Sequence, residues 1–141
     1  MNDPDRQMTT PDAQLLAASM QGQIAELRAA LAAGANPDAR QSAVKAGWTA
    51  LSCAVLSGKE EAVQLLLAAG AEVNAQCADG TTALHKACLW GQVRIAALLL
   101  DHGADATIED EEGWTARQLA KAQENRELLQ LLAERSTTPK F

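Results

Sequence analysis

His85 and Cys88 are the two residues whose types best suit metal binding or catalysis. They are three positions apart, so on a helix they would share one face, one turn from each other. Two ligands fall short of a zinc site, which takes four protein ligands, or three and a water. Cys53 and Cys77 do not complete a metal-type spacing. The sequence therefore predicts no metal site, no cofactor and no catalytic residue here.

A run of four acidic residues, Glu109, Asp110, Glu111 and Glu112, is the other candidate for chemistry. Contiguous carboxylates lack the alternating ligands of a calcium loop. The run can be the solvated tip of a connection, or a landing site for a basic partner. The glycines form no phosphate-binding motif. Without a catalytic constellation we expect a protein that is not an enzyme and has no small-molecule substrate.

The composition limits the partners further. The chain has 141 residues, 48% hydrophobic and 3% aromatic, with a net charge of −6. So acidic a chain argues against nucleic acid and anionic membranes as partners, because binding either one needs Lys and Arg to meet the phosphates. Three cysteines without a pairing pattern, and a start with no apolar signal segment, favour a cytoplasmic protein with reduced thiols.

Glycines recur with one period along the chain. Gly47, Gly80 and Gly113 are 33 residues apart, as are Gly58 and Gly91. A further pair, 70 and 103, keeps the same spacing. Three independent markers with one period indicate stacked supersecondary units.

The residues between these glycines resemble the ankyrin repeat. The stretch 82–87 reads TALHKA and the stretch 98–105 reads LLLDHGAD, close to the family's T-P-L-H-x-A and G-A-D segments. Ala83 stands where the family usually has proline. The pattern is weaker at 49–52 and 115–118, and His85 has no equivalent there. The resemblance covers about residues 12–134.

This resemblance implies an all-α solenoid of four helix-turn-helix repeats joined by finger-like hairpins, the outer repeats acting as caps. We expect a polar, mobile lead over 1–11, a domain over 12–135 with repeats at about 12–40, 41–76, 77–109 and 110–135, and a tail over 136–141. Helices are predicted at 13–20, 23–33, 49–57, 60–69, 82–90, 93–102, 115–123 and 126–134. Asp12 is the expected N-cap of the first helix. The first finger, 40–46, is three residues longer than the others, which fits either tolerated drift or a contact loop.

Structural roles account for many of the residues that recur in the repeat pattern. The first helices carry small residues on the packed side, including Ala17 and Ala18, and the second helices supply leucines. The resemblance implies that His85 hydrogen-bonds between Thr82 and neighbouring backbone. Thr49 and Thr115 are expected to cap their helices in the same way.

Candidate binding residues are those that the repeat does not need. Trp48 and Trp114 lie between the turn glycine and the helix-start threonine, where Thr81 is their counterpart, and Trp90 precedes an inter-helix glycine. The resemblance implies that such positions line a concave face. Each indole could instead pack over its own turn as a lid. The predicted protein-binding residues are Trp48, Leu56, Asp79, Thr81, Leu89, Trp90, Glu111, Glu112 and Trp114, with Lys45 also at a finger tip.

We therefore predict a non-enzymatic module that binds a partner protein carrying apolar anchors and some basic character. The alternative is a dedicated inhibitor or immunity-type protein that blocks one enzyme or toxin, because an acidic body can occlude a basic active site.

Overall fold

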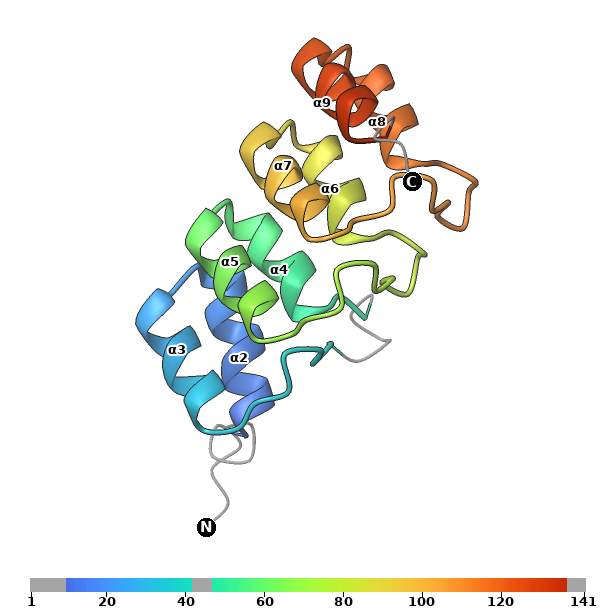
Figure 1. The fold of residues 1–141 in the computed structure, drawn as a ribbon. Helices are drawn as coiled ribbons and strands as arrows, with labels where there is room; N and C mark the ends of the chain where they lie inside the picture. The colour runs from blue at the N-terminus through green and yellow to red at the C-terminus, as the bar shows by residue number, and fades with distance from the viewer. Residues whose placement is uncertain (1–9, 42–46, 137–141) are drawn as a thin grey trace, which may run out of the picture. The chain divides into compact units, whose positions relative to one another are not determined.

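The computed structural model describes residues 10–41 and 47–136, and every named element within these ranges is an α-helix (Figure 1). One isolated antiparallel bridge joins Arg40 and Thr49. The chain divides into two compact blocks: the N-terminal block ends at Glu72 and the C-terminal block begins at Val73. Each block contains two helical pairs.

The N-terminal block contains α2 (Pro11–Gln21), α3 (Ile24–Ala32), α4 (Ala50–Ser57) and α5 (Glu60–Ala68). The first helices of its two pairs, α2 and α4, contact each other, and so do the second helices, α3 and α5. The two pairs of the block therefore stack in the same orientation, first helix on first helix and second helix on second helix. An ion pair between Arg28 and Glu61, at 3.1 Å, joins the second helices on their exposed side.

The C-terminal block repeats this arrangement with α6 (Ala83–Leu89), α7 (Val93–Asp101), α8 (Ala116–Ala122) and α9 (Arg126–Ser136). Here α6 contacts α8, and α7 contacts α9. Arg135 on α9 forms an ion pair with Asp101 on α7. All eight helices lie within two residues of the ranges expected from the sequence.

Threonines begin the first helix of each of the last three pairs, as predicted. The side chains of Thr49, Thr82 and Thr115 accept the N–H of the third helical residue, at 3.1, 3.3 and 3.2 Å. Each bond satisfies one of the four N–H groups that a helix start leaves without an internal partner. Short helices of seven or eight residues are thereby defined at one end.

The predicted cap of the first helix is wrong. Thr10, not Asp12, caps α2, with its Oγ1 accepting the N–H of Ala13 at 3.2 Å, and Pro11 takes the first helical position. Pro suits that position because its missing N–H would have no helical partner. Asp12 instead accepts the backbone N–H of Asn36 at 2.8 Å.

That contact of Asp12 lies within the first repeat, and two similar bonds join successive repeats. The side chain of Asp38 accepts the N–H of Glu72 at 2.7 Å, within the N-terminal block. In the C-terminal block, the Oδ1 of Asn74 accepts the N–H of Asp105 at 2.8 Å. Each of these two bonds satisfies a loop N–H with a carboxylate or amide from the preceding repeat, which sets the loop spacing.

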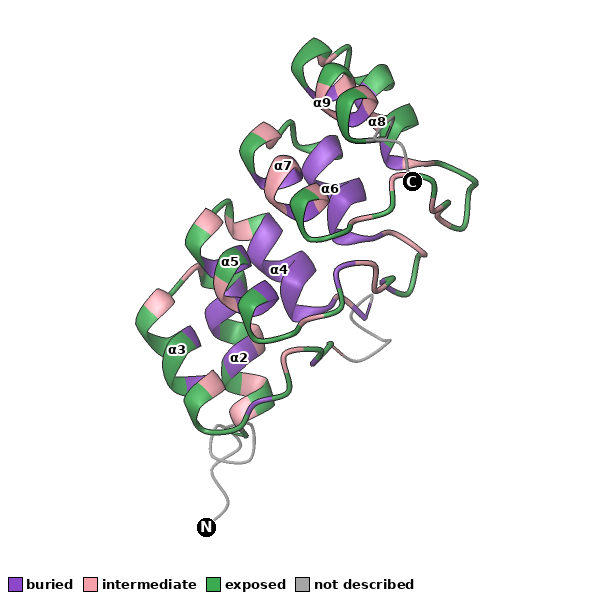
Figure 2. Cartoon of the chain, in the orientation of Figure 1, coloured by how far each residue is buried: buried purple, intermediate pink, exposed green. Residues whose placement is uncertain are grey.

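The core is built as expected from leucines on the second helices and small residues on the first. Leu27, Leu66, Leu99 and Leu128 are fully buried. Figure 2 shows buried residues continuing along α4 and along α6. Of the two alanines expected on the packed side of α2, Ala18 is buried, but Ala17 is exposed. The buried residues of α2 are Leu15, Ala18 and Ser19, and at about 100° per residue Ala17 lies on the opposite side of the helix.

The C-terminal block has two fingers of its own, 77–81 and 110–114, which we call from here on the first and the second finger; both are tight turns held by backbone bonds. Cys77 N donates to Thr81 O at 2.7 Å, and Asp110 N donates to Trp114 O at 2.9 Å. The two turns contact each other directly, since Glu111 N donates to Asp79 O at 3.0 Å. The second finger is therefore fixed against the first.

Candidate protein-binding surface

Trp48 and Leu56 are the predicted binding residues of the N-terminal block. Trp48 is half-buried, and its carbonyl accepts the N–H of Gln41 at 2.8 Å. Leu56, near the end of α4, is 42% exposed. Lys45 lies outside the described residues. The other predicted residues belong to the C-terminal block, so a concave binding face shared by all of them stays a prediction.

Trp114 combines a fixed backbone with an exposed side chain. Its N–H donates to the carboxylate of Asp110 at 2.9 Å. Its carbonyl accepts from Asp110 N and from His85 Nε2, the latter at 2.8 Å. The side chain is nevertheless 41% exposed. The indole is therefore not sealed beneath its turn.

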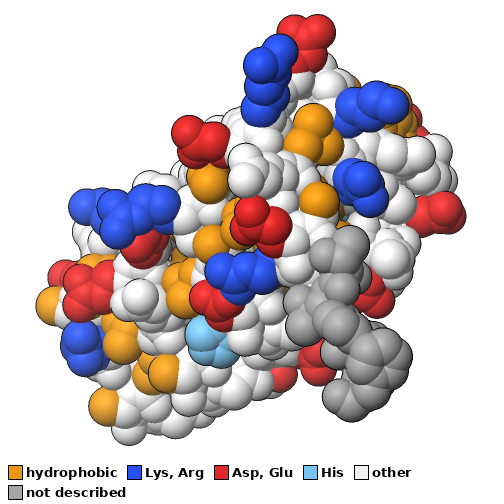
Figure 3. All heavy atoms as spheres, turned by 45° about the horizontal axis from the view of Figure 1, so that its top comes forward, with side chains coloured by type: hydrophobic (Ala, Val, Ile, Leu, Met, Phe, Trp, Pro, Cys, Tyr) orange, Lys and Arg blue, Asp and Glu red, His pale blue; other side chains and the backbone are white. Residues whose placement is uncertain are grey.

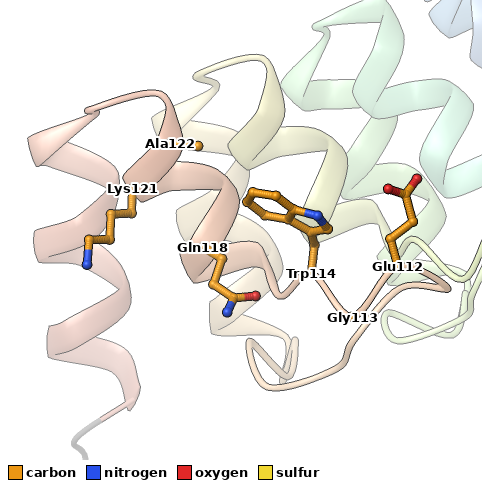
Figure 4. A pocket seen from close by; sticks show the side chains of 6 residues that line it. All are labelled: Glu112, Gly113, Trp114, Gln118, Lys121 and Ala122. Carbon is orange, nitrogen blue, oxygen red and sulfur yellow. The ribbon is translucent and has the colours of Figure 1, made fainter.

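The Trp114 indole borders a hollow of about 440 Å³, lined by Glu112, Gly113, Trp114, Gln118, Lys121 and Ala122. Figure 4 shows the side chains in the order Lys121, Gln118, Trp114 and Glu112 across this hollow, with the first two on α8 and the last two on the finger. We call it the α8 corner. It offers one large apolar surface between groups of opposite charge.

Leu89 and Trp90 form a second apolar feature at the end of α6. They are 42% and 41% exposed. Trp90 is the C-cap residue of α6, and its N–H donates to Lys86 O at 3.1 Å. A residue in that position projects its side chain from a rigid helix end. Trp90 is therefore exposed, and its role in binding stays a prediction.

The side chains of Asp79 and Thr81 hydrogen-bond to each other and stabilise their own turn. The Oδ1 of Asp79 accepts from Thr81 N at 3.1 Å and from Thr81 Oγ1 at 2.7 Å. Lys86 Nζ, on a residue only 5% exposed, donates to Thr81 Oγ1 at 3.0 Å. Burial by itself would raise the pKa of Asp79, but the bonds from Thr81 and the charge of Lys86 outweigh it and lower that pKa. The polar chain therefore stiffens the first finger.

The acidic run of four contains one residue that closes the turn, Asp110, and three that are exposed, Glu109 among them. Asp110 accepts the backbone N–H of Glu112 and of Trp114, both at 2.9 Å, so its carboxylate closes the turn. Glu111 and Glu112 are exposed. On the face shown in Figure 3, acidic and basic side chains are interspersed with hydrophobic ones. Charge on that face can therefore orient a partner locally at individual side chains.

His85 is a structural residue, as its resemblance to the family implies. Its Nδ1 accepts the N–H of Thr82 at 3.0 Å, and its Nε2 faces the Trp114 carbonyl at 2.8 Å. Both ring nitrogens are thus used, and the side chain is 1% exposed. Burial raises the pKa of the Cys88 thiol to about 12, which keeps it protonated and poorly nucleophilic. Among the described residues there is no group of three or more potential metal ligands.

Sequence reasoning missed Lys86, Gln118 and Lys121. Gln118 could have been found, because it lies one period of 33 residues after His85. It also forms the same capping box: its Oε1 accepts the N–H of Thr115 at 2.9 Å. Lys86 carries no such signal, since its burial follows from packing rather than from the local pattern.

The family assignment follows from both the helical pairs and the sequence comparison. The family model described as ankyrin repeats in three copies matches residues 15–110 and again 59–140. The chain therefore belongs to the ankyrin-repeat family, and its all-α repeat fold agrees with the prediction. Ankyrin repeats generally serve as protein–protein interaction modules and are generally non-enzymatic. A comparison with curated proteins found no match. No helix in the described ranges is long and apolar enough to span a bilayer.

Proposed function

We propose that this chain is a non-enzymatic binding module that holds a partner protein against its fingers and first helices. The observation that carries the proposal is the exposure of Leu89, Trp90 and Trp114, at 41–42%, on backbone that is already hydrogen-bonded. The repeat itself does not require these side chains. One period away, Thr81 replaces Trp114, and Gln123 replaces Trp90.

Rigid, exposed tryptophans favour binding for two physical reasons. Indole rings bring a large apolar area and one N–H donor, and tryptophan is enriched among residues that dominate binding energy. Because the Trp114 backbone is fixed before binding, little conformational entropy is lost when the partner arrives. The surface is therefore preformed rather than assembled by the partner.

The partner should offer apolar side chains to Trp90 and Trp114 and a basic group to the finger tip. Glu111 and Glu112 are exposed there. Opposite charges across an interface mainly set its orientation and association rate. Trp48 and Leu56 are the residues proposed to contact a partner in the N-terminal block.

A dedicated inhibitor of a basic enzyme or toxin is the second candidate. The net charge of −6 and the exposed acids at the finger tip favour it. Such a protein would form a tight one-to-one complex that abolishes the activity of its target. A general binding module would leave its partner active.

The test is a double variant, Trp90→Ala with Trp114→Ala, used as bait for affinity capture followed by mass spectrometry. Met20→Ala is the matched control, because Met20 is also 42% exposed but lies on α2. We expect the double variant to keep its circular dichroism and lose the partner that the wild type and the control retain. Capture that is unchanged in the double variant would refute the proposed surface.

A further inference from the structure

The contact between His85 and the second finger shows how one repeat receives the next in the C-terminal block. A backbone N–H can only donate, so the His85 Nδ1 that faces Thr82 N must be an acceptor. The hydrogen of the neutral ring is therefore on Nε2, which donates to the Trp114 carbonyl at 2.8 Å. The helix α6 thus presents one side-chain N–H to a main-chain carbonyl of the following finger.

Gln118 presents an equivalent donor on α8. Its Oε1 accepts the N–H of Thr115 at 2.9 Å, and the Oγ1 of Thr115 accepts the N–H of Gln118 at 3.2 Å. The amide oxygen occupies the role of the His85 Nδ1, so the NH₂ group corresponds to the His85 Nε2. His85 is 1% exposed, whereas Gln118 is exposed. The described part of the chain contains no finger that covers Gln118.

The neighbours of Gln118 on α8 are basic, whereas the residues at the same repeat positions on α6 are apolar. One period earlier, Leu84 and Cys88 are buried. Their counterparts Arg117 and Lys121 are exposed, and neither forms an ion pair with a described residue. Two cations one helical turn apart favour an acidic ligand rather than the apolar face of another repeat.

We propose that the α8 corner binds an extended, acidic peptide segment of the partner protein, with a main-chain carbonyl accepting from Gln118 Nε2. An apolar side chain of the segment lies against the Trp114 indole, and its carboxylates face Lys121 and Arg117. Glu112, at the other side of the hollow, faces a neutral or basic residue. This inference rests on the proposed function and names the chemistry of the partner at this end of the surface.

The second finger of this chain supplies the probe, because it already occupies the equivalent place on α6. A synthetic peptide with the sequence of residues 107–116, TIEDEEGWTA, carries the acids, the tryptophan and the carbonyl. Its neutral form, TIQNQQGWTA, keeps the shape without the charge. Binding is followed by ¹H–¹⁵N NMR on the labelled full chain, at the side-chain NH₂ resonances of Gln118 and the indole N–H of Trp114.

Three variants distinguish the effect of the Gln118 side-chain N–H donor from the effect of its capping bond to Thr115 and from the effect of an added negative charge. Gln118→Glu keeps the oxygen that accepts from Thr115 but removes the donor. Gln118→His restores a ring N–H as in His85. Gln123→Glu adds the same charge at an exposed position that does not line the hollow.

We expect the acidic peptide to shift both resonances in the wild type and in Gln123→Glu. Affinity should fall about tenfold in Gln118→Glu, as expected for one lost hydrogen bond with an unsatisfied carbonyl, and should be kept in Gln118→His. Equal binding to Gln118→Glu and wild type, or equal binding of the neutral peptide, would overturn the proposal.

Two other occupants are outcomes of the same experiment. Self-association that Gln118→Glu abolishes would assign the corner to a second copy of the chain and overturn the proposal. Peptide binding that requires deletion of residues 137–141 would assign it to that segment and do the same. If peptide binding fails while Trp90→Ala with Trp114→Ala still loses the partner, the proposed function stands without this inference.

Discussion

Replacing Glu124 by glycine should stabilise the protein, although it removes a side chain. Glu124 has φ of +55°, and it is the only described residue other than glycine with positive φ. Its counterpart one period earlier is Gly91, with φ of +67°. The fourth repeat thus keeps the left-handed turn between its helices but uses a residue that is strained there.

The size of the effect follows from two opposing contributions. The left-handed conformation costs an L-residue about 1–2 kcal/mol. A new glycine costs about 0.4–1 kcal/mol through the larger freedom of the unfolded chain. The Glu124 side chain is exposed, so little packing is lost. We expect a net gain of about 1 kcal/mol, equivalent to a rise in Tm of about 3 °C for a chain of this size.

Urea unfolding followed by circular dichroism measures this change, with Gln123→Gly as the matched control. Gln123 is also exposed and precedes Glu124, but its φ is −81°, so a glycine there relieves no strain. We expect the control to lose about 0.5–1 kcal/mol. If Glu124→Gly is no more stable than the wild type, or if both variants change alike, the strain argument is refuted.

Three further predictions follow from the packing of the C-terminal block. Gly80→Ala should cost about 2–3 kcal/mol of the free energy of unfolding in urea, because its φ is +82° and a Cβ would lie 2.8 Å from Glu111 N. Gly113→Ala is the control: its φ is +83°, but a Cβ there would meet nothing within 4 Å, so it should cost only about 1 kcal/mol. Equal losses in the two variants would contradict the close approach between Gly80 and Glu111. Leu99→Ala should cost about 2–5 kcal/mol because Leu99 is fully buried, and a loss below 1 kcal/mol would contradict this packing. Burial raises the pKa of the Cys88 thiol to about 12, so this thiol should resist alkylation until the protein unfolds. Because the thiol ionises at lower pH in the unfolded chain, the contribution of the buried thiol to stability is retained below pH 9 and lost as pH rises toward 12. A Cys88→Ala variant should lack that loss of stability at alkaline pH.

The two first helices of the C-terminal block, α6 and α8, differ in how far the same repeat positions are covered. On α6, His85 bonds to the second finger, and its neighbours Leu84 and Cys88 are buried. On α8, the same positions are polar and exposed. The same local architecture therefore supports packing in one repeat and leaves a donor, an indole and two cations available in the next.

Much of the fold could be predicted because its signals are local. A threonine at a helix start and a glycine at a left-handed turn each satisfy a requirement of the backbone within a few residues. Their recurrence every 33 residues predicted stacked units, and the stretches TALHKA and LLLDHGAD resembled the ankyrin repeat, a family that the family match confirms. Asp12 shows the limit of this reasoning. It has the right chemistry for a cap, but its best partner is the N–H of Asn36, 24 positions away.

The candidate site was predictable only in part, because exposure depends on what the rest of the chain covers. The sequence by itself determined the helical pairs and the positions of the tryptophans within their repeats, and its resemblance to the family implied the structural role of His85. Only the tertiary structure decided that Trp90 and Trp114 are exposed while Trp48 is half-buried, that Thr81 is tied to Asp79 and Lys86, and that Gln118 has an uncovered amide. The physical reason is that backbone requirements are met by neighbours in sequence, whereas burial and side-chain pairing are set by neighbours in space.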